Sequence, residues 1–262
     1  MAQYNTLYSL AYYYDIAFRR DISHEVTFLA DLFQKRSGRA LASMADLACG
    51  PGYHARTFAE RGVRSIGLDL RPEMIAFARE QAEAEASPPI DWMVGDIRDF
   101  DLGAPVDLIL TSYDSIDCLA DGAEIAEHFR AVARNLTPDG LYVFELTHPR
   151  DCRPYDYQDF HYSGERDGVR VDIHWAVNNP VADPVTQIVA CDIVVEVDDN
   201  GKKQTYQDHA RERFTGAGEF IALSCLSGAL DLVEWFGDFR LDQPFDNSPG
   251  ARRMIGVMRC TA

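Results

Sequence analysis

The stretch that decides the fold is Met44-Ala45-Asp46-Leu47-Ala48-Cys49-Gly50-Pro51-Gly52. Its apolar start is typical of a buried strand, and the glycines that follow predict a tight turn. The spacing of Ala55, Phe58 and Ala59 then predicts an amphipathic helix, which Gly62 ends. A strand, a glycine turn and a helix in this order form one unit of a parallel α/β sheet, in which glycine lets the backbone approach a ligand closely.

The same unit repeats along the chain. Further strands are expected at 65–70, 92–94, 106–112 and 141–146, and further helices at 72–85 and 123–135. This alternation predicts a doubly wound, mostly parallel, Rossmann-like sheet of the α/β class with helices on both faces. Two more strands, near 230–235 and 254–259, would complete a seven-stranded sheet. Spaced apolar and aromatic positions in residues 4–35 predict one or two amphipathic helices.

Residues 151–214 have a different pattern of apolar and polar residues. Apolar side chains alternate with polar ones over 169–177 and again over 189–197, which is typical of half-buried antiparallel strands. Asp198-Asp199-Asn200-Gly201 predicts a hairpin turn. We therefore expect three parts: a helical N-terminal cover at 1–40, a Rossmann-like domain made of 41–150 and 215–262, and an antiparallel β insert at 151–214 after the fifth strand.

Composition narrows the class of protein. The 25 basic and 42 acidic residues give a net charge of −17, which argues against a nucleic-acid partner. The six cysteines include no C-x-x-C pair, which favours a reducing, cytoplasmic location. No apolar run approaches the roughly 18 residues of a membrane span, so no membrane partner is expected. The histidines and cysteines show no metal-ligand spacing, and no metal site is expected.

Two acidic residues follow the next two predicted strands. Asp69 lies 19 residues after Gly50, where its carboxylate can accept hydrogen bonds from both hydroxyls of a ribose. Asp96 follows the third strand and can accept from an adenine amino group, while Ile97 packs on the ring. The alternative is that the glycines only make a turn and Asp69 only caps the helix at Pro72.

Together these pieces resemble the class I S-adenosylmethionine-dependent methyltransferases, whose motifs are D-x-A-C-G-x-G, G-x-D-x-S/R-x-x-M and G-D-x-x-x-F. This chain has them at 46–52, 67–74 and 95–100. The resemblance continues through 112–116 and 136–140, where the usual Pro-Gly-Gly turn is Pro138-Asp139-Gly140. It implies S-adenosylmethionine as cofactor and S-adenosylhomocysteine as product. The cofactor-binding residues that it implies are Tyr14, Arg20, Asp46, Ala48, Gly50, Gly52, Asp69, Leu70, Met74, Asp96, Ile97, Ser112 and Tyr113.

The N-terminal segment Tyr13-Tyr14-Asp15-Ile16-Ala17-Phe18 resembles the Y-D-x-x-F segment of aminosugar N-methyltransferases and glycine methyltransferase-like enzymes. By that resemblance Tyr14 would lie near the sulfonium of the cofactor. Arg19 or Arg20 can pair with the methionine carboxylate, for which a guanidinium is well suited. Equally, the two arginines can be solvated surface residues.

Methyl transfer from a sulfonium is an in-line displacement, so the protein mainly aligns the nucleophile and excludes water, and a base is optional. The candidate catalytic residues are Tyr14, Tyr113 and His148. His148 is expected at the carboxyl edge of the sheet, as a base or as a substrate contact. Asp114 faces the same crevice. The insert is expected to form the far wall of the substrate site, with His174, His209, Arg211 and Arg213 on the polar faces of its strands. Alternatively, these four residues only form a solvated face of the sheet.

The predicted function is methylation of a small molecule, with an amine nitrogen slightly ahead of a hydroxyl oxygen. The acceptor is not identified by the sequence, and a homodimer is compatible with it. An NAD-dependent oxidoreductase is one alternative, because Gly50, Gly52 and Ala55 also satisfy G-x-G-x-x-A. Asp46 and Asp96 argue against it. A non-catalytic protein that binds an adenosyl ligand is the other, since it would keep the same binding residues.

Overall fold

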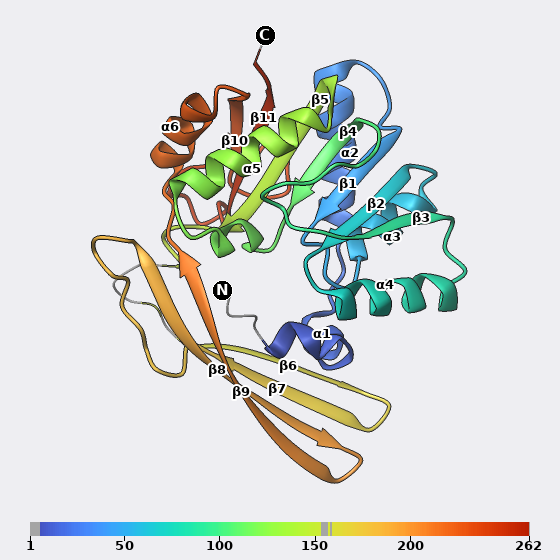
Figure 1. Cartoon of the computed structure of the whole chain (residues 1–262), viewed down its shortest axis with the longest axis vertical. Helices are drawn as coiled ribbons and strands as arrows, with labels where there is room; N and C mark the ends of the chain where they lie inside the picture. Colours follow the sequence, from blue (N-terminus) through green and yellow to red (C-terminus); the bar gives the residue numbers. More distant parts are fainter. Residues whose placement is uncertain (1–5, 153–156, 158, 262) are drawn as a thin grey trace.

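The computed structural model describes residues 6–152, 157 and 159–261, which form two sheets and their flanking helices (Figure 1). The larger sheet has seven strands in the order β10-β11-β5-β4-β1-β2-β3. Its strands are β1 Ser43–Leu47, β2 Arg64–Asp69, β3 Ile90–Val94, β4 Val106–Thr111, β5 Leu136–Thr147, β10 Leu230–Phe236 and β11 Arg253–Cys260. Strands β1 to β5 pair in parallel, and β11 is antiparallel to both β5 and β10. The predicted doubly wound, mostly parallel α/β fold is confirmed.

Helices cover both faces of the larger sheet (Figure 1). Their bounds are α2 Ser23–Ser37, α3 Tyr53–Glu60, α4 Pro72–Ala84, α5 Gly122–Arg134 and α6 Ala217–Ser227. Phe129 of α5 and Phe220 of α6 are fully buried in one apolar layer, and Phe33 of α2 and Phe58 of α3 in the other. Among the described residues, no helix is both long enough and apolar enough to cross a membrane.

The glycine turn connects β1 to α3 as the sequence predicts. Gly50 and Gly52 have φ angles of 51° and 77°, in the left-handed region that favours glycine. Gly52 is the N-cap residue of α3. A Cβ atom on Gly52 would overlap the ring of Trp92, so the close packing of the turn against β3 requires glycine there as well.

The insert forms a second sheet of four antiparallel strands in the order β6-β7-β8-β9. The strands are β6 Phe160–Arg166, β7 Val169–Trp175, β8 Ile188–Asp199 and β9 Lys202–Arg213, all within the predicted 151–214. Asn200 and Gly201 have φ angles of 52° and 88° and form the predicted hairpin turn. The start of the insert at 153–156 and 158, and residues 1–5 of the N-terminal cover, lie outside the described residues.

The N-terminal helices have two different positions. Helix α2 packs on the larger sheet, whereas α1 Ala11–Phe18 packs on β6 and β7 of the insert. Asp15 of α1 is fully buried and accepts hydrogen bonds from Arg166 of β6 at 2.5 Å and from the Tyr53 hydroxyl of α3 at 2.6 Å. Helix α1 therefore links the two sheets on one side of the space between them.

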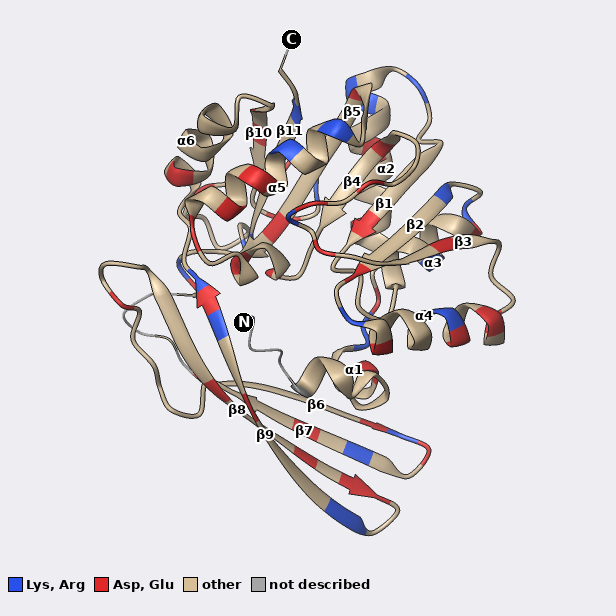
Figure 2. Ribbon diagram, viewed as in Figure 1, with Lys and Arg blue, Asp and Glu red and all other residues tan. Residues whose placement is uncertain are grey.

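Charged side chains are distributed over the whole molecule. Figure 2 shows acidic and basic residues interspersed on helices such as α4 and α5 and on the strands of both sheets. The net charge of −17 therefore comes from many dispersed carboxylates.

Candidate active site

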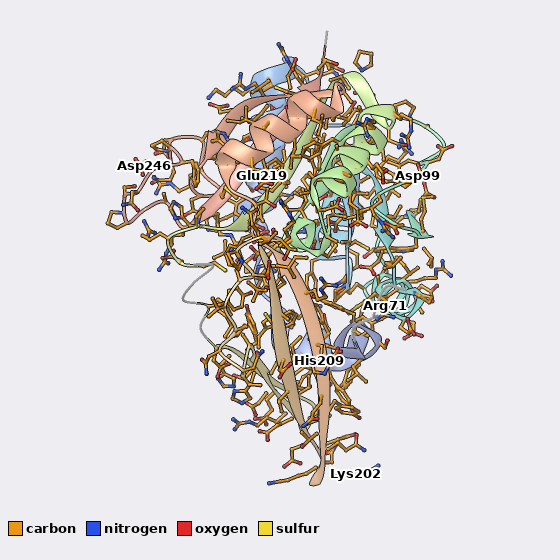
Figure 3. All side chains as sticks on the ribbon, turned by 60° about the vertical axis from the view of Figure 1, so that its left-hand side comes forward. Arg71, Asp99, Lys202, His209, Glu219 and Asp246 are labelled. Atoms are coloured by element: carbon orange, nitrogen blue, oxygen red, sulfur yellow. The ribbon has the colours of Figure 1, made fainter. Side chains whose placement is uncertain are left out.

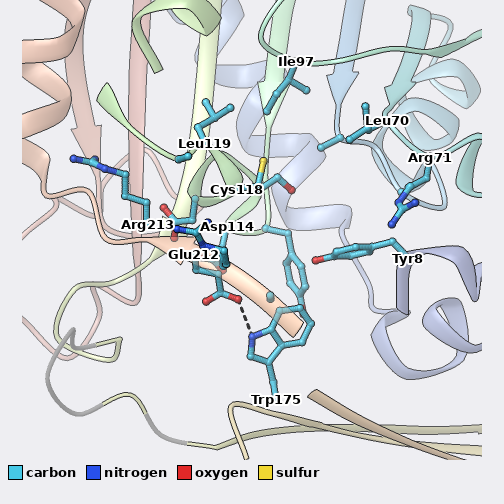
Figure 4. Close-up of a pocket in the computed structure, with 18 of the residues that line it drawn as sticks. Tyr8, Leu70, Arg71, Ile97, Asp114, Cys118, Leu119, Trp175, Glu212 and Arg213 are labelled. Atoms are coloured by element: carbon cyan, nitrogen blue, oxygen red, sulfur yellow. Dashed lines mark hydrogen bonds between the residues drawn. The ribbon is translucent and has the colours of Figure 1, made fainter. Parts of the chain in front are cut away.

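A cavity of about 760 Å³ lies between the carboxyl ends of the parallel strands and the inner face of the insert sheet (Figure 4). Ligands of open α/β sheets bind at this edge because the loops after the strands converge there. The predicted site residues that line the cavity are Tyr14, Ala48, Gly50, Asp69, Leu70, Asp96, Ile97 and Tyr113. The cavity thus brings together residues from four strand ends and from α1.

Asp69 is fixed at the end of β2 by two backbone N–H groups. The N–H of Gly50 donates to Oδ2 at 2.8 Å and that of Arg71 to Oδ1 at 2.8 Å. The carboxylate is 8% exposed, and this burial raises the pKa of Asp69 above its usual range. A carboxylate has about four acceptor positions, so both oxygens can still accept from a ligand's neighbouring hydroxyls.

Asp96 is held by an arginine that the sequence analysis did not single out. The Arg98 guanidinium donates to both carboxylate oxygens of Asp96, at 2.6 to 3.0 Å, and also to Glu124 at 2.7 Å. This ion pair lowers the pKa of Asp96. The apolar side chains of Leu70 and Ile97 also line the cavity, so a flat apolar ring can lie between them and an ionised acceptor.

Asp46 lies behind the glycine turn and is 2% exposed. Its Oδ2 atom is buried with no hydrogen-bond partner in the described part of the chain, and His54 Nδ1 is 4.0 Å away. Burial raises the pKa of Asp46 to about 6, against the opposing effect of His54. An unpartnered buried carboxylate oxygen is costly, and a cationic group of a ligand would satisfy it.

Asp46→Asn is expected to stabilise the unliganded protein at neutral pH. Folding raises the pKa of Asp46 from 3.8 to about 6. Below pH 4 the carboxyl is protonated in both states and does not lower the free energy of unfolding. Above pH 6 it is ionised and lowers the free energy of unfolding by about 2–3 kcal/mol. Denaturant unfolding should therefore show a gain for Asp46→Asn that grows as pH rises from 4 to 6. The same change at exposed Asp31 should show no such trend, and a gain independent of pH for Asp46→Asn would contradict this account.

Tyr14 and Tyr113 form part of an aromatic wall. Tyr14 stacks on Phe18 with 4.4 Å between ring centroids. Tyr113 follows β4 with a φ angle of 60°, and its N–H donates to Glu145 at 2.6 Å. A left-handed conformation of a bulky residue is strained, and such strain is concentrated at functional sites.

Five residues assigned to the cofactor site do not line the cavity: Arg20, Asp46, Gly52, Met74 and Ser112. Arg20 lies 4.2 Å above the Tyr113 ring and pairs with Glu25 at 3.2 Å. Met74 is 1% exposed and packs in a small apolar cluster that includes Tyr14. These two residues support the wall of the cavity, and direct ligand contacts for them remain a prediction.

His148 does not line the cavity, where the sequence analysis expected it. Its Nε2 contacts the Asp246 carbonyl oxygen at 3.0 Å, and its Nδ1 accepts the Arg150 N–H at 3.1 Å. Figure 3 shows Asp246 on the opposite side of the molecule from Arg71, which lines the cavity. Because neighbouring side chains of an extended chain point in opposite directions, Thr147 lines the cavity and His148 faces the β10–β11 loop.

His148→Ala is therefore expected to affect folding rather than catalysis. Removing the buried imidazole takes away its contacts with the Asp246 carbonyl oxygen and the Arg150 N–H and its packing on Phe245, which should lower the free energy of unfolding by about 1–3 kcal/mol. The catalytic rate at a temperature well below unfolding should change by less than about twofold. Thermal unfolding and steady-state kinetics measure the two effects, and a loss of rate in a stably folded variant would restore His148 as a catalytic candidate.

The insert end of the cavity contains residues that the sequence analysis missed. Glu212 of β9 accepts hydrogen bonds from Trp175 Nε1 at 2.7 Å and from the Tyr157 hydroxyl (Figure 4). Burial raises the pKa of Glu212. The alternation along β9 was the available signal, because it gives Glu212 the same face as Asp208 and Ala210. Of the polar residues predicted on the insert, His209, Arg211 and Arg213 line the cavity and His174 does not. Arg213 forms an ion pair with Glu219 at 2.6 Å.

Comparisons with known proteins agree with this geometry. A methyltransferase domain model matches residues 44–140. A dTDP-3-amino-3,6-dideoxy-α-D-glucopyranose N,N-dimethyltransferase of Streptomyces fradiae is 30% identical over 175 residues, 62% of this chain and 66% of that protein. A dTDP-4-amino-2,3,4,6-tetradeoxy-D-glucose N,N-dimethyltransferase of Saccharopolyspora spinosa is 32% identical over 48% of each chain. The chain spans about half to two thirds of the length of the curated relatives it matches.

Solved structures share the fold over nearly the whole chain. An S-adenosylmethionine-dependent methyltransferase of Clostridium acetobutylicum superposes with a TM-score of 0.79 at 18% identity, covering 98% of this chain and 100% of that one. A sugar N-methyltransferase of Streptoalloteichus sp superposes with a TM-score of 0.73 at 23% identity, covering 99% and 95%. The second sheet therefore belongs to the shared fold.

Proposed function

We propose, on the premise that residues 44–140 belong to the methyltransferase domain family, that this chain transfers a methyl group from S-adenosylmethionine to an amine of a small molecule. One observation carries the proposal: a single cavity joins the glycine turn and Asp69 to an enclosed end beneath the insert sheet. S-adenosylmethionine supplies a methyl group bonded to a positively charged sulfur and leaves as S-adenosylhomocysteine.

The residues on the cofactor side fit this group. Asp69 offers two acceptor oxygens to the ribose hydroxyls, and Asp96 with Ile97 offers an acceptor and an apolar face to adenine. Asp46 lies behind the turn and does not line the cavity, and its unpartnered oxygen adds negative charge at the end of the site where the cofactor's ammonium group would lie. Gly50 lacks the Cβ atom that would extend toward Tyr14, 4.0 Å away, and so leaves room beside the turn.

The protein's own contribution is alignment and exclusion of water. Helix α1 presents Tyr14 and Phe18 to the cavity, and Tyr113 presents its ring from the other side. Burial raises the pKa of Tyr14, so its hydroxyl stays protonated at neutral pH and can donate a hydrogen bond. This aromatic wall is uncharged and can hold the methyl donor and the acceptor in line for the displacement.

An amine acceptor is supported by the relatives, whose names describe dimethylation of amino sugars attached to dTDP. Amino sugars of this kind are the first acceptors to test. We place the reaction in the cytoplasm, which agrees with six cysteines that are all unpaired. A homodimer stays a prediction, and analytical ultracentrifugation tests it.

The decisive experiment is calorimetric titration with S-adenosylmethionine, S-adenosylhomocysteine and NAD, followed by an acceptor screen with a tritiated methyl donor. We expect binding of both sulfur ligands, no binding of NAD, and label transfer to an amine. Binding of the sulfur ligands without transfer to any acceptor would favour a non-catalytic protein. Binding of NAD alone would favour an oxidoreductase.

A further inference from the structure

The insert end of the cavity contains two carboxylates without a cationic partner in the described part of the chain. Asp117 lies in the short helix η2 Ser115–Cys118, and Glu212 lies on β9. Asp117 Oδ1 is buried and has no hydrogen-bond partner among the described residues. Glu212 accepts hydrogen bonds only from the neutral donors Tyr157 and Trp175. Both side chains line the cavity.

Arg213 and Arg253 are already paired with other carboxylates, whereas Arg211, which also lines the cavity, is exposed. Arg213 donates to Glu219 at 2.6 Å, and Arg253 pairs with Glu145 and with Asp114, at 3.2 Å to the latter. Burial and the charges of Asp114 and Glu212 raise the pKa of Asp117 well above its usual range. Asp117 and Glu212 are half-buried and line one cavity, so they repel one another when both are ionised, and this end of the cavity favours a bound cation.

The walls around the two carboxylates are aromatic. Tyr8, Tyr157, Tyr162 and Trp175 line the same cavity, and Figure 4 shows Trp175 bonded to Glu212 with Tyr8 close by. Aromatic faces attract cations, and the attraction is stronger where water is excluded. Carboxylates combined with aromatic rings therefore recognise an ammonium group and discriminate against a hydroxyl at the same position.

We propose that Asp117 and Glu212 bind the acceptor's amine as an ammonium ion and that Glu212 takes one of its protons. The inference rests on the proposed function, since it names the groups that select and prepare the nucleophile. One N–H bond breaks, its electron pair stays on nitrogen, and the proton bonds to a Glu212 oxygen, which leaves a neutral amine and a neutral carboxylic acid. The donors Trp175 and Tyr157 occupy one lone pair on each Glu212 oxygen and leave another free.

The test is calorimetry on the full chain saturated with S-adenosylhomocysteine, using two matched pairs of probes. One pair is dTDP-3-amino-3,6-dideoxy-α-D-glucopyranose and its 3-hydroxyl counterpart; the other is cyclohexylamine and cyclohexanol. Asp117→Asn and Glu212→Gln are each expected to weaken binding of the amines about 10- to 100-fold, and that of the alcohols less than about threefold. Glu196→Gln, at an exposed position on β8, is the control and should change neither.

Asp117→Asn keeps the test decisive if Glu212→Gln disturbs the packing of Tyr157 and Trp175, because Asp117 Oδ1 has no bond to lose among the described residues. The inference is overturned if the wild-type protein binds neither amine more tightly than its alcohol, or if Asp117→Asn weakens both members of a pair equally. Binding of S-adenosylhomocysteine in the same samples distinguishes failure of this inference from failure of the proposed function. If S-adenosylhomocysteine binds but the amines are not preferred, only the inference is refuted. If S-adenosylhomocysteine does not bind, the proposed function is refuted as well.

Discussion

Asp69→Ala is expected to lower the affinity for S-adenosylmethionine and S-adenosylhomocysteine about 100-fold or more. By the proposed role of Asp69, the variant would lose two charge-assisted hydrogen bonds to the ribose, each worth about 1.5–3 kcal/mol. It also removes the acceptor of the Gly50 and Arg71 N–H groups, so the turn loses the side chain that fixes its position beside the ligand. Calorimetric titration of the purified variant measures the loss for both ligands.

Asp91→Ala is the matched control, because Asp91 is an exposed carboxylate on neighbouring β3. It should bind both ligands as the wild type does. Asp69→Ala must also remain folded at the temperature of the titration, which thermal unfolding verifies. A folded Asp69→Ala variant that keeps wild-type affinity would show that the ribose lies elsewhere, and the assignment of the glycine turn would fall with it.

The cofactor side of the site was predictable because its signals are local in sequence. The turn at 46–52 needs glycine for backbone reasons, and Asp69 follows the next strand at a fixed spacing. The conformation of the turn and the position of Asp69 both depend on neighbouring residues and on the order of strands in a parallel sheet. The parallel order of β1 to β5 also follows from short local periods. Eight residues predicted for this part of the site line the cavity as a result.

The acceptor side was not predictable in the same way, because its residues meet only in the folded chain. Glu212 is bonded to Trp175, 37 positions away on another strand, and lines the same cavity as Asp117, which lies in the short helix η2. The alternation along β9 indicates only which face Glu212 lies on, and nothing near it in sequence indicates that this face meets Asp117 and Trp175. His148 follows β5 as expected, but the direction of its side chain depends on its contact with the β10–β11 loop, which the local sequence does not indicate.

The position of α1 also depends on contacts between distant segments. Aromatic and apolar spacing predicted a helix over this region but not that it would pack on the insert. Gly164 of β6 allows that packing, because a Cβ atom there would overlap the Ile16 carbonyl oxygen and lie 2.7 Å from its carbonyl carbon. Ordinary contacts are near 3.4–4 Å. The obstacle is backbone, so no change of side-chain rotamer can relieve it.

Gly164→Ala is therefore expected to move α1 away from β6 by about 1 Å and to lower the rate of methyl transfer about 100-fold, since misplacement of this size in a reacting pair is costly. The shift also stretches the ion pair between Asp15 and Arg166, and because Asp15 is fully buried this adds to the destabilisation. Gly164 lies on β6 of the insert sheet, whereas Gly50 and Asp69 lie at the larger sheet, so the binding enthalpy of S-adenosylhomocysteine should change less than the rate. Single-turnover kinetics and calorimetry measure the two effects.

Gly218→Ala in α6 is the control for the change of residue, because a Cβ atom at Gly218 meets nothing within 4 Å. If Gly164→Ala unfolds the chain, far-ultraviolet circular dichroism will show it, and Asp15→Asn then tests the same contact, since it keeps the shape of the side chain while removing the charge that Arg166 pairs with. A normal rate in a folded Gly164→Ala variant would mean that α1 does not align the reactants. A reduced rate with intact cofactor binding would mean that the close approach of α1 and β6 sets the distance between methyl donor and acceptor, because α1 carries Tyr14 and Phe18, which line the cavity.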